Sequence, residues 1–497
     1  MQLISQSPSD SGEHGPAIPR NPRNFSLHWI GLLYSVCIAG LFLDTLAGPA
    51  FQRQLLRMKP ASVAHLLAGI AGVLDSEILR TLSFSISFGA LCVAYVWGCY
   101  RLQSSTAPRK IIWAWAVVFV FLLIPLPPHY ADDLVSYAQQ GKVLAVYHMN
   151  PYVHALEDTG DPWAVYPRGW RNVVPYGPVM AVLSAMAVET GRNNIILALL
   201  TLKLIMSASF LLTAWTVSKI LDLLTPSKTP WALFFFLWNP LMLLELIGEG
   251  HNDAVMMALM MVGLYLMVRS KHVAGFMALF FSALTKFATI ILLPLYASLL
   301  LRRREYRSLI WITLLCLATS LGFYFLFFRD PRSFDGVVVV SRLSWGSITW
   351  LGEVVLRQYM GASSQAAHDL IQRPLLVLFA VFLLWRMTKI DSEPTLLQES
   401  GLVFIFFMLI VANQMNPWYT ALIIPLVAVS STPLKCSIVF FLTAWPLARY
   451  FRPFFHQPPL WANLGRTLLF YGILVAIFWW YLRLQNPGEI SRQERNI

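Results

Sequence analysis

The sequence predicts an all-α polytopic membrane protein with about 12–14 transmembrane helices, whose extracytoplasmic loops carry short helices. Hydrophobic residues make up 57% of the 497 residues and charged residues 12%, and the mean hydropathy is +0.60. Such a chain has too little charge to cover a water-soluble surface. Apolar runs recur along it, each near the roughly 20 residues that cross about 30 Å of hydrocarbon, without the alternation of barrel strands.

The apolar runs locate the expected spans, with ends good to a few residues. The long run at 272–301 is expected to form a hairpin with Lys286 near its tip. Residues 26–485 then form one transmembrane domain between two cytosolic tails, a disordered one at 1–25 and a short one at 486–497. The spans are expected near residues 29–48, 81–100, 109–127, 194–217, 231–247, 252–268, 272–301, 308–328, 372–388, 400–413, 415–430, 434–451 and 464–483.

Clusters of Lys and Arg beside the runs set the expected orientation, because cytoplasmic loops of membrane proteins collect positive charge. The same rule explains the net charge of +12 without nucleic acid as a partner. With these clusters inside, two large loops, about 128–193 and 329–371, lie outside together with 248–253 and 413–419. The five cysteines form no CxxC pair, so neither a disulfide framework nor a zinc site is indicated.

Two adjacent carboxylates, Asp132 and Asp133, begin the first large loop. One interpretation is a helix cap, since carboxylates stabilise the start of a helix. The other is catalysis, because Tyr137 follows Asp133 by one helical turn and can lie beside it. Two further tyrosines follow in the loop, Tyr152 in "NPY" and Tyr176 in "YGP".

A second polar cluster stands in "ELIGEGHND" between two apolar runs. It offers Glu249, His251, Asn252 and Asp253, whose carboxylate, imidazole and amide groups can bind sugar hydroxyls. The same groups can hold a divalent cation, and the residue types alone do not choose a metal. A helix cap at Asn252 or Asp253 is the structural alternative.

Four segments together resemble a known family: "DDLVSYAQQGKVLAVYHMNPY", "WNPLMLLELIGEGHNDAVMMALMM", "ALTKFATIILLPL" and "NQMNPWYTALIIPL". They look like the matching parts of polyprenol-phosphate-mannose-dependent mannosyltransferases of the GT-C superfamily of integral membrane glycosyltransferases. The resemblance runs in order over about 128–430. The first 110 and last 60 residues resemble the family only in being hydrophobic.

The resemblance implies a GT-C-like fold and transfer of one hexose, with mannose the first choice, from a polyprenyl-phosphate donor to an acceptor hydroxyl. The acceptor would be a glycan or glycolipid on the extracytoplasmic face of a bacterial plasma (inner) membrane. In the superfamily an Asp in the first large external loop is the general base. The matching residue here is Asp133, with Asp132 as its neighbour.

Elementary chemistry agrees with these roles. A sugar hydroxyl is a poor nucleophile, so a carboxylate must take its proton, and single displacement with one base inverts the anomeric centre. A departing phosphate needs positive charge, for which Lys286 is the first candidate and Arg342 and Arg449 are weaker ones. An ion pair of Lys286 with a carboxylate such as Glu245, or its extension to the interface, is the alternative.

Aromatic residues near these groups complete the expected site. Trp418 and Tyr419 in "NPWY", and Tyr152, can stack on a sugar or line a prenyl groove. They are equally expected in the aromatic belt of a membrane interface.

Two other functions fit a polytopic protein with buried charge: a transporter and a lipid-carrier flippase. The sequence shows no matching halves of the kind that transporters use, and its polar residues gather at one boundary instead of the midplane. A flippase would not need the Asp133 and Tyr137 pair. Cofactor use stays open, with a divalent cation possible.

Overall fold

The computed structural model describes residues 27–47, 77–103, 108–128, 132–166, 173–450 and 459–485. These residues form helices joined by short turns, and within them the chain has no β-strand, only an isolated bridge between Trp345 and Gln414. The predicted all-α class is confirmed. Both expected cytosolic tails lie outside the described residues.

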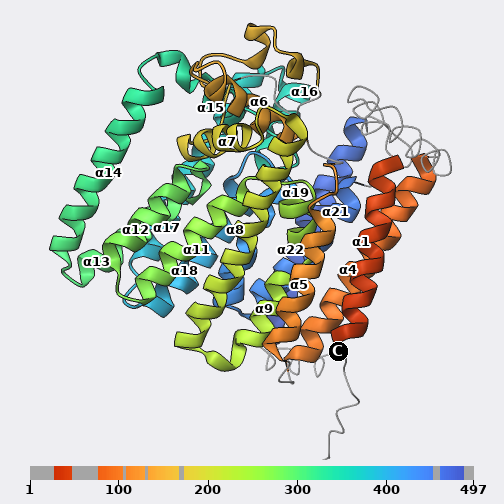
Figure 1. The fold of residues 1–497 in the computed structure, drawn as a ribbon. Coiled ribbons are helices and arrows are strands. Elements are labelled where there is room, and N and C mark those ends of the chain that lie inside the picture. The colour runs from red at the N-terminus through yellow and green to blue at the C-terminus, as the bar shows by residue number, and fades with distance from the viewer. Residues whose placement is uncertain are drawn as a thin grey trace, which may run out of the picture.

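The helices run roughly alongside one another as a bundle (Figure 1). At one side α1 (Leu27–Ala47) packs against α4 (Glu77–Leu102) and α5 (Arg109–Leu123), and at the centre α8 (Ile195–Leu224) packs against α11 (Asp253–Val268). Further elements of the bundle, long and short, are α9 (Thr229–Leu237), α10 (Pro240–Met242), η4 (Leu243–Gly248), α12 (His272–Ala283), η5 (Phe287–Leu292), α13 (Leu293–Arg302), α14 (Tyr306–Phe327), α17 (Ser364–Met387), α18 (Glu393–Phe406), η7 (Phe407–Val411), α19 (Pro417–Thr420), α20 (Ile423–Val429), α21 (Pro433–Tyr450) and α22 (Leu460–Gln485).

Six described helices are long and apolar enough to cross a membrane, and a bent pair, Pro226–Leu237 with Pro240–Gly248, would make a seventh. The other expected spans fall on shorter apolar helices, among them His272–Ala283 and Phe287–Arg302. A polytopic membrane protein is therefore supported, while the count of 12–14 spans stays a prediction. The six are Thr81–Leu102, Ile195–Leu224, Tyr306–Phe327, Ser364–Met387, Glu393–Val411 and Leu460–Leu484.

The short helices of the two large loops gather at one end of the bundle (Figure 1). The described parts of 128–193 and 329–371 thus lie at the same end of the bundle, while their position outside the membrane, and the side they face, stay predictions. The first loop carries α6 (Asp133–Ala145), η1 (Leu156–Thr159), η2 (Pro162–Val165) and α7 (Pro178–Thr190); the second carries η6 (Pro331–Phe334), α15 (Asp335–Ser341) and α16 (Ile348–Met360).

A bend of 47° separates α9 from η4, at Asn239–Pro240. Proline has no N–H, so the helical hydrogen bonds cannot continue through it. Carbonyls freed near the bend find side-chain donors: Tyr95 donates to Phe235 at 2.7 Å and Tyr34 donates to Trp238 at 2.7 Å. The break is thus stable without water and lets the chain turn toward the polar cluster.

Lys203 of α8 joins three segments below the site. Its ammonium is 3% exposed and donates to the carbonyls of Leu123 (3.3 Å), Leu126 and Gly248 (2.7 Å). These carbonyls lie at the ends of α5 and η4, where helices leave acceptors unpaired. Lys203 therefore holds the end of α5, which leads to Asp133, close to the end of η4, which leads to His251 and Asp253.

We expect Lys203→Met to lower the thermal unfolding midpoint of the protein in detergent, because each buried carbonyl left without a donor costs about 1–3 kcal/mol. Lys219→Met, on the same helix but partly exposed and 5.9 Å from the Trp215 ring, is the matched control and should change the midpoint little. Equal midpoints for the two variants would contradict this role.

Candidate active site

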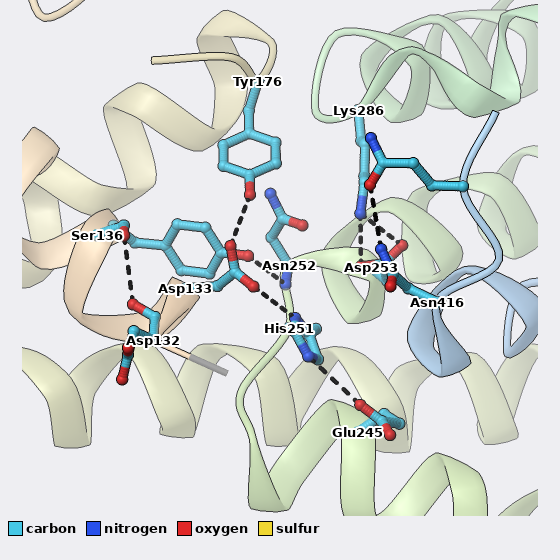
Figure 2. Close-up of polar contacts among 12 residues, drawn as sticks. Asp132, Asp133, Ser136, Tyr176, Glu245, His251, Asn252, Asp253, Lys286 and Asn416 are labelled. Atoms are coloured by element: carbon cyan, nitrogen blue, oxygen red, sulfur yellow. Dashed lines mark hydrogen bonds and ion pairs between the residues drawn. The ribbon is translucent and has the colours of Figure 1, made fainter. Parts of the chain in front are cut away.

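The polar residues that the sequence singled out meet near the loop end of the bundle (Figure 2). Five parts of the chain contribute: the start of α6, the segment just before α7, the turn between η4 and α11, the break between α12 and η5, and the start of α19. We call Asp133, Tyr176, His251, Asp253 and Lys286 the central cluster.

Asp133, the first residue of α6, lies between a phenol and an imidazole. Its Oδ1 accepts a hydrogen bond from the Tyr176 hydroxyl at 3.1 Å, and its Oδ2 lies 3.6 Å from Nδ1 of His251. The second distance is an electrostatic contact, too long for a hydrogen bond. The carboxylate is 18% exposed, so it is held in place yet reachable.

Burial raises the pKa of Asp133 above its ordinary value of 3.8. The charge of Lys286 and the hydrogen bond from Tyr176 oppose this effect without cancelling it. A carboxylate with a raised pKa is a stronger base, which suits proton removal from a hydroxyl.

Asp132 stands at the N-cap of α6, but its carboxylate makes no capping hydrogen bond. Its backbone carbonyl instead accepts from the Ser136 N–H and hydroxyl, at 3.1 and 3.2 Å. Figure 2 shows the carboxylate pointing away from Asp133. The structure therefore does not bring the Asp132 side chain into the central cluster. The acidic pair does stand at the start of a helix, as the capping interpretation expected, but without a capping hydrogen bond from Asp132.

Lys286 forms an ion pair with a carboxylate, as the structural alternative expected, but the partner is Asp253 and not Glu245. The ammonium lies 2.9 and 2.7 Å from the two Asp253 oxygens, and Asp253 is fully buried. The ring centroid of Tyr419 lies 4.5 Å from the ammonium, within range of a cation–π contact. An ammonium has three donors, and Asp253 uses two of them.

The break at Lys286 also fixes Tyr176. Where α12 ends, the carbonyls of Leu284 and Thr285 accept from the N–H groups of Val179 and Gly177, at 3.1 and 3.0 Å. A side chain at Gly177 would collide with the Leu284 carbonyl, so only glycine fits this close approach. The phenol beside Asp133 is thereby tied to the backbone beside Lys286.

Asn252 is fully buried, and neither atom of its side-chain amide has a hydrogen-bond partner in the described part of the chain. It occupies the N-cap of α11 without making the capping bond. In Figure 2 its side chain extends between those of Asp133 and Lys286. Buried amides are normally paired, so this one has capacity for a polar ligand.

Other predicted residues support the cluster from behind. Tyr137 accepts the Asn252 N–H at 3.4 Å and packs edge-on against Tyr176, with centroids 5.4 Å apart. Tyr152, fully buried, donates to the Tyr176 carbonyl at 2.9 Å. Both tyrosines therefore position the backbone and the ring of their neighbours in the site, and neither reaches the exposed side of Asp133.

The remaining predicted residues divide between the cluster and other places. Trp418 stacks on His251, with centroids 4.2 Å apart and 19° between the planes. Glu249 is buried and interacts electrostatically with Lys203. Arg342 is exposed at the end of α15, and its side chain makes no hydrogen bond or ion pair within the described residues. The side chain of Arg449 lies outside the described residues.

A mainly apolar groove of about 310 Å³ opens beside Lys286. One wall comes from α15 and another from η7, neither of which the sequence suggested as part of a site. Its lining includes Tyr176, Lys286, Val337, Val340, Met408 and Tyr419.

Sequence reasoning did not place two groups behind His251: it named Glu245 only as a possible partner of Lys286, and it did not name Tyr450. Glu245 Oε2 lies 3.4 Å from Nε2 of His251, and Tyr450 donates to Glu245 Oε1 at 2.8 Å. A carboxylate inside an apolar run was a signal for Glu245. Tyr450 gave none, since it arrives from a helix 205 residues further along the chain.

No group of three His, Cys, Asp or Glu side chains is placed to hold a metal ion among the residues described. The acidic groups at the cluster instead face Tyr176, His251 and Lys286.

Residues 29–302, more than half of the chain, match the family described as "Alpha-(1->6)-mannopyranosyltransferase, N-terminal domain". The chain belongs to this family. Alpha-(1->6)-mannopyranosyltransferase A of Mycobacterium tuberculosis is 28% identical over 243 residues, 47% of this chain and 45% of that protein. The protein of the same name from Corynebacterium glutamicum is 27% identical over 169 residues, 34% of this chain and 33% of that protein. These alignments thus span less than half the length of each relative.

The family assignment confirms the resemblance to GT-C mannosyltransferases and corrects its extent. The match begins at residue 29, whereas the sequence motifs placed the start near 128. It includes Asp133, His251 and Lys286 and ends before Trp418. The structure joins the later part of the chain to this matched segment, because Trp418, which lies outside the segment, stacks on His251 within it.

We expect Tyr176→Phe to raise the pKa of Asp133 further, because it removes a hydrogen bond to the charged carboxylate. The measurement is an infrared titration of the protonated carboxyl band, assigned by difference against Asp133→Asn. Tyr147→Phe is the matched control, since Tyr147 donates to a different carboxylate, Asp161, at 2.7 Å. An unchanged or lower midpoint in Tyr176→Phe would contradict the assignment.

Proposed function

We propose that the protein transfers mannose from a polyprenyl-phosphate donor to a hydroxyl of a glycan or glycolipid acceptor. The reaction takes place on the extracytoplasmic face of the plasma membrane. The observation that carries this proposal is the position of Asp133, a partly exposed carboxylate with raised pKa, across a cluster from Lys286 and its apolar groove. The names of the family and of its relatives support mannose and an α-(1→6) linkage.

Asp133 is the general base. It takes the proton of the acceptor hydroxyl while that oxygen attacks the anomeric carbon of the donor sugar. The bond from this carbon to the phosphate oxygen breaks, and its electron pair leaves with the phosphate. One displacement inverts the anomeric centre, so an α product requires a β-linked donor.

Lys286 stabilises the phosphate. Asp253 occupies two of its three donors and holds it beside the groove, which leaves one donor for a phosphate oxygen. Positive charge there acts mainly in the transition state, when negative charge grows on the leaving oxygen. The apolar groove lined by Val337 and Met408 receives the first part of the prenyl chain.

The sugar lies between these two groups. Asn252 offers an unpaired carbonyl and amide to its hydroxyls from a buried position. A buried amide left unpaired by a wrong sugar costs about 1–3 kcal/mol, so it contributes to selectivity as well as affinity. Tyr419 forms an aromatic wall beside Lys286.

We expect Asp133→Asn to lower the transfer rate by about 100- to 10,000-fold, because an amide cannot accept the proton. The measurement uses purified protein in lipid with radiolabelled polyprenyl-phosphate mannose, at matched folding and with donor binding retained. Asp132→Asn is the neighbouring comparison and should keep most of the wild-type rate.

Equal rates for wild type and Asp133→Asn would remove Asp133 from the chemistry. If wild-type protein transfers no sugar from any of several prenyl-linked donors, a transporter or a lipid-carrier flippase becomes the better assignment. A flippase would still move the lipid donor between leaflets in the Asp133→Asn variant.

Val337→Trp should fill the groove and raise KM for a long-chain donor about tenfold, which corresponds to about 1.4 kcal/mol of lost binding. A donor analogue with a very short prenyl chain should keep its KM, since it does not enter the groove. Val338→Trp is the matched control, because Val338 is 42% exposed and does not line the groove. The same KM change for both donors would argue against a prenyl site there.

A further inference from the structure

Behind Asp133, a row of buried groups leads away from the exposed side of the site (Figure 2). His251 presents Nδ1 to Asp133 at 3.6 Å and Nε2 to Glu245 at 3.4 Å. His251 is 1% exposed and Glu245 fully buried, so neither meets solvent. Acceptor recognition does not need this row, because it lies behind the carboxylate that the acceptor reaches.

The backbone is shaped to set His251 between the two carboxylates. Glu245 lies in η4, a π-helical turn, and the His251 N–H donates to the Glu245 carbonyl at 3.2 Å. Gly250 then turns the chain with φ +77°, where an added side chain would lie 2.9 Å from Leu134. Such π turns are uncommon and occur often at functional sites.

Two contacts fix the orientation of the ring and of its partner. Trp418 stacks on the imidazole, which holds its plane. The Tyr450 hydroxyl donates to Oε1 of Glu245 at 2.8 Å, so Oε2 is the oxygen that faces the imidazole. At 3.4 Å, Oε2 of Glu245 and Nε2 of His251 are within ion-pair range, and neither atom makes a hydrogen bond among the described residues. A proton on Nε2 faces Oε2 and leaves the lone pair of Nδ1 toward Asp133.

We propose that His251 receives from Asp133 the proton removed from the acceptor, and that Glu245 is the positioning residue that fixes the imidazole tautomer and stabilises the imidazolium. This inference rests on the proposed function. The proton moves from the acceptor oxygen to Oδ2 of Asp133 and then to Nδ1 of His251, after these two atoms close from 3.6 Å to hydrogen-bond distance. The bond from the anomeric carbon to the acceptor oxygen forms, and the bond to the phosphate oxygen breaks with its electron pair.

The surrounding charges explain why Glu245 is needed. Three charged groups face or act on the imidazole: Asp133 from α6, Glu245 from η4, and Lys286 from the break before η5, whose ammonium is paired with Asp253 of α11. Lys286 and burial disfavour a positive ring. Asp133 becomes neutral when it takes the proton, and Asp253 is already paired with Lys286, so Glu245 supplies the charge that offsets an imidazolium.

The first test is Glu245→Gln, whose amide oxygen can still accept from Nε2 but carries no charge. We expect kcat to fall about 100-fold with KM for donor and acceptor unchanged, because only the proton transfer is weakened. The acidic limb of the pH profile should move to lower pH, since removing the negative charge makes protonation of His251 and Asp133 harder.

Glu353→Gln is the matched control. Glu353 also pairs with a histidine, the partly buried His368, at 2.7 Å, but from α16 in the second loop. It should change neither kcat nor the pH profile. Wild-type kcat in Glu245→Gln, or an equal loss in Glu353→Gln, would overturn the inference.

A second variant keeps the test decisive if Glu245→Gln does not fold. His251→Ala leaves a slot beside Trp418, and added imidazole should restore the rate at least about tenfold above that of the variant alone. No restoration would overturn the inference. If wild-type protein transfers no mannose at all, the proposed function fails first; if Asp133→Asn behaves as expected and Glu245→Gln does not, only the proton acceptor is wrong.

Discussion

The ion pair between Lys286 and Asp253 is the interaction on which the site depends. It joins the start of α11 to the break between α12 and η5, and Asp253 is fully buried. Removing one partner of a buried pair leaves an uncompensated charge, which costs about 3–5 kcal/mol. The pair therefore holds two breaks in the helical bundle at a fixed separation, and Tyr176 follows because Gly177 is bonded to the backbone beside Lys286.

These breaks are possible because each freed backbone group finds a partner. Irregular backbone inside a membrane protein is stable only where protein or a polar cavity satisfies it. Lys203 supplies donors below the site, and Tyr34 and Tyr95 supply them at the bend after α9. If these helices were straight and unbroken, the polar side chains of the central cluster would be buried far from one another. Breaking the helices brings Asp133, His251 and Lys286 to one place.

The family match and the geometry divide the site into two parts. Asp133, His251, Asp253 and Lys286 all come from within residues 29–302, which match the family. Trp418, the η7 wall of the groove and the α15 wall come from later in the chain. In the proposed reaction the first part handles proton and phosphate, whereas the second shapes the space for the lipid. If relatives use donors with prenyl chains of different length, or different acceptors, we expect their sequences to differ in this second part.

The sequence by itself determined the class of protein and most of the central cluster. Hydropathy gave the helical membrane framework, and the break expected at Lys286 is present because a lysine, unlike its apolar neighbours, needs a polar partner. The sequence alone identified three site residues, Asp133, His251 and Lys286, because charged groups between apolar runs have few structural uses. The tertiary structure decided their partners. It paired Lys286 with Asp253 instead of Glu245, turned Asp132 away, left Arg342 exposed, and placed Glu245 and Tyr450 behind His251. Local periodicity fixes which residues share a helical face, but the rotation and depth of each helix depend on packing against segments distant in sequence, so these pairings appear only in the folded chain.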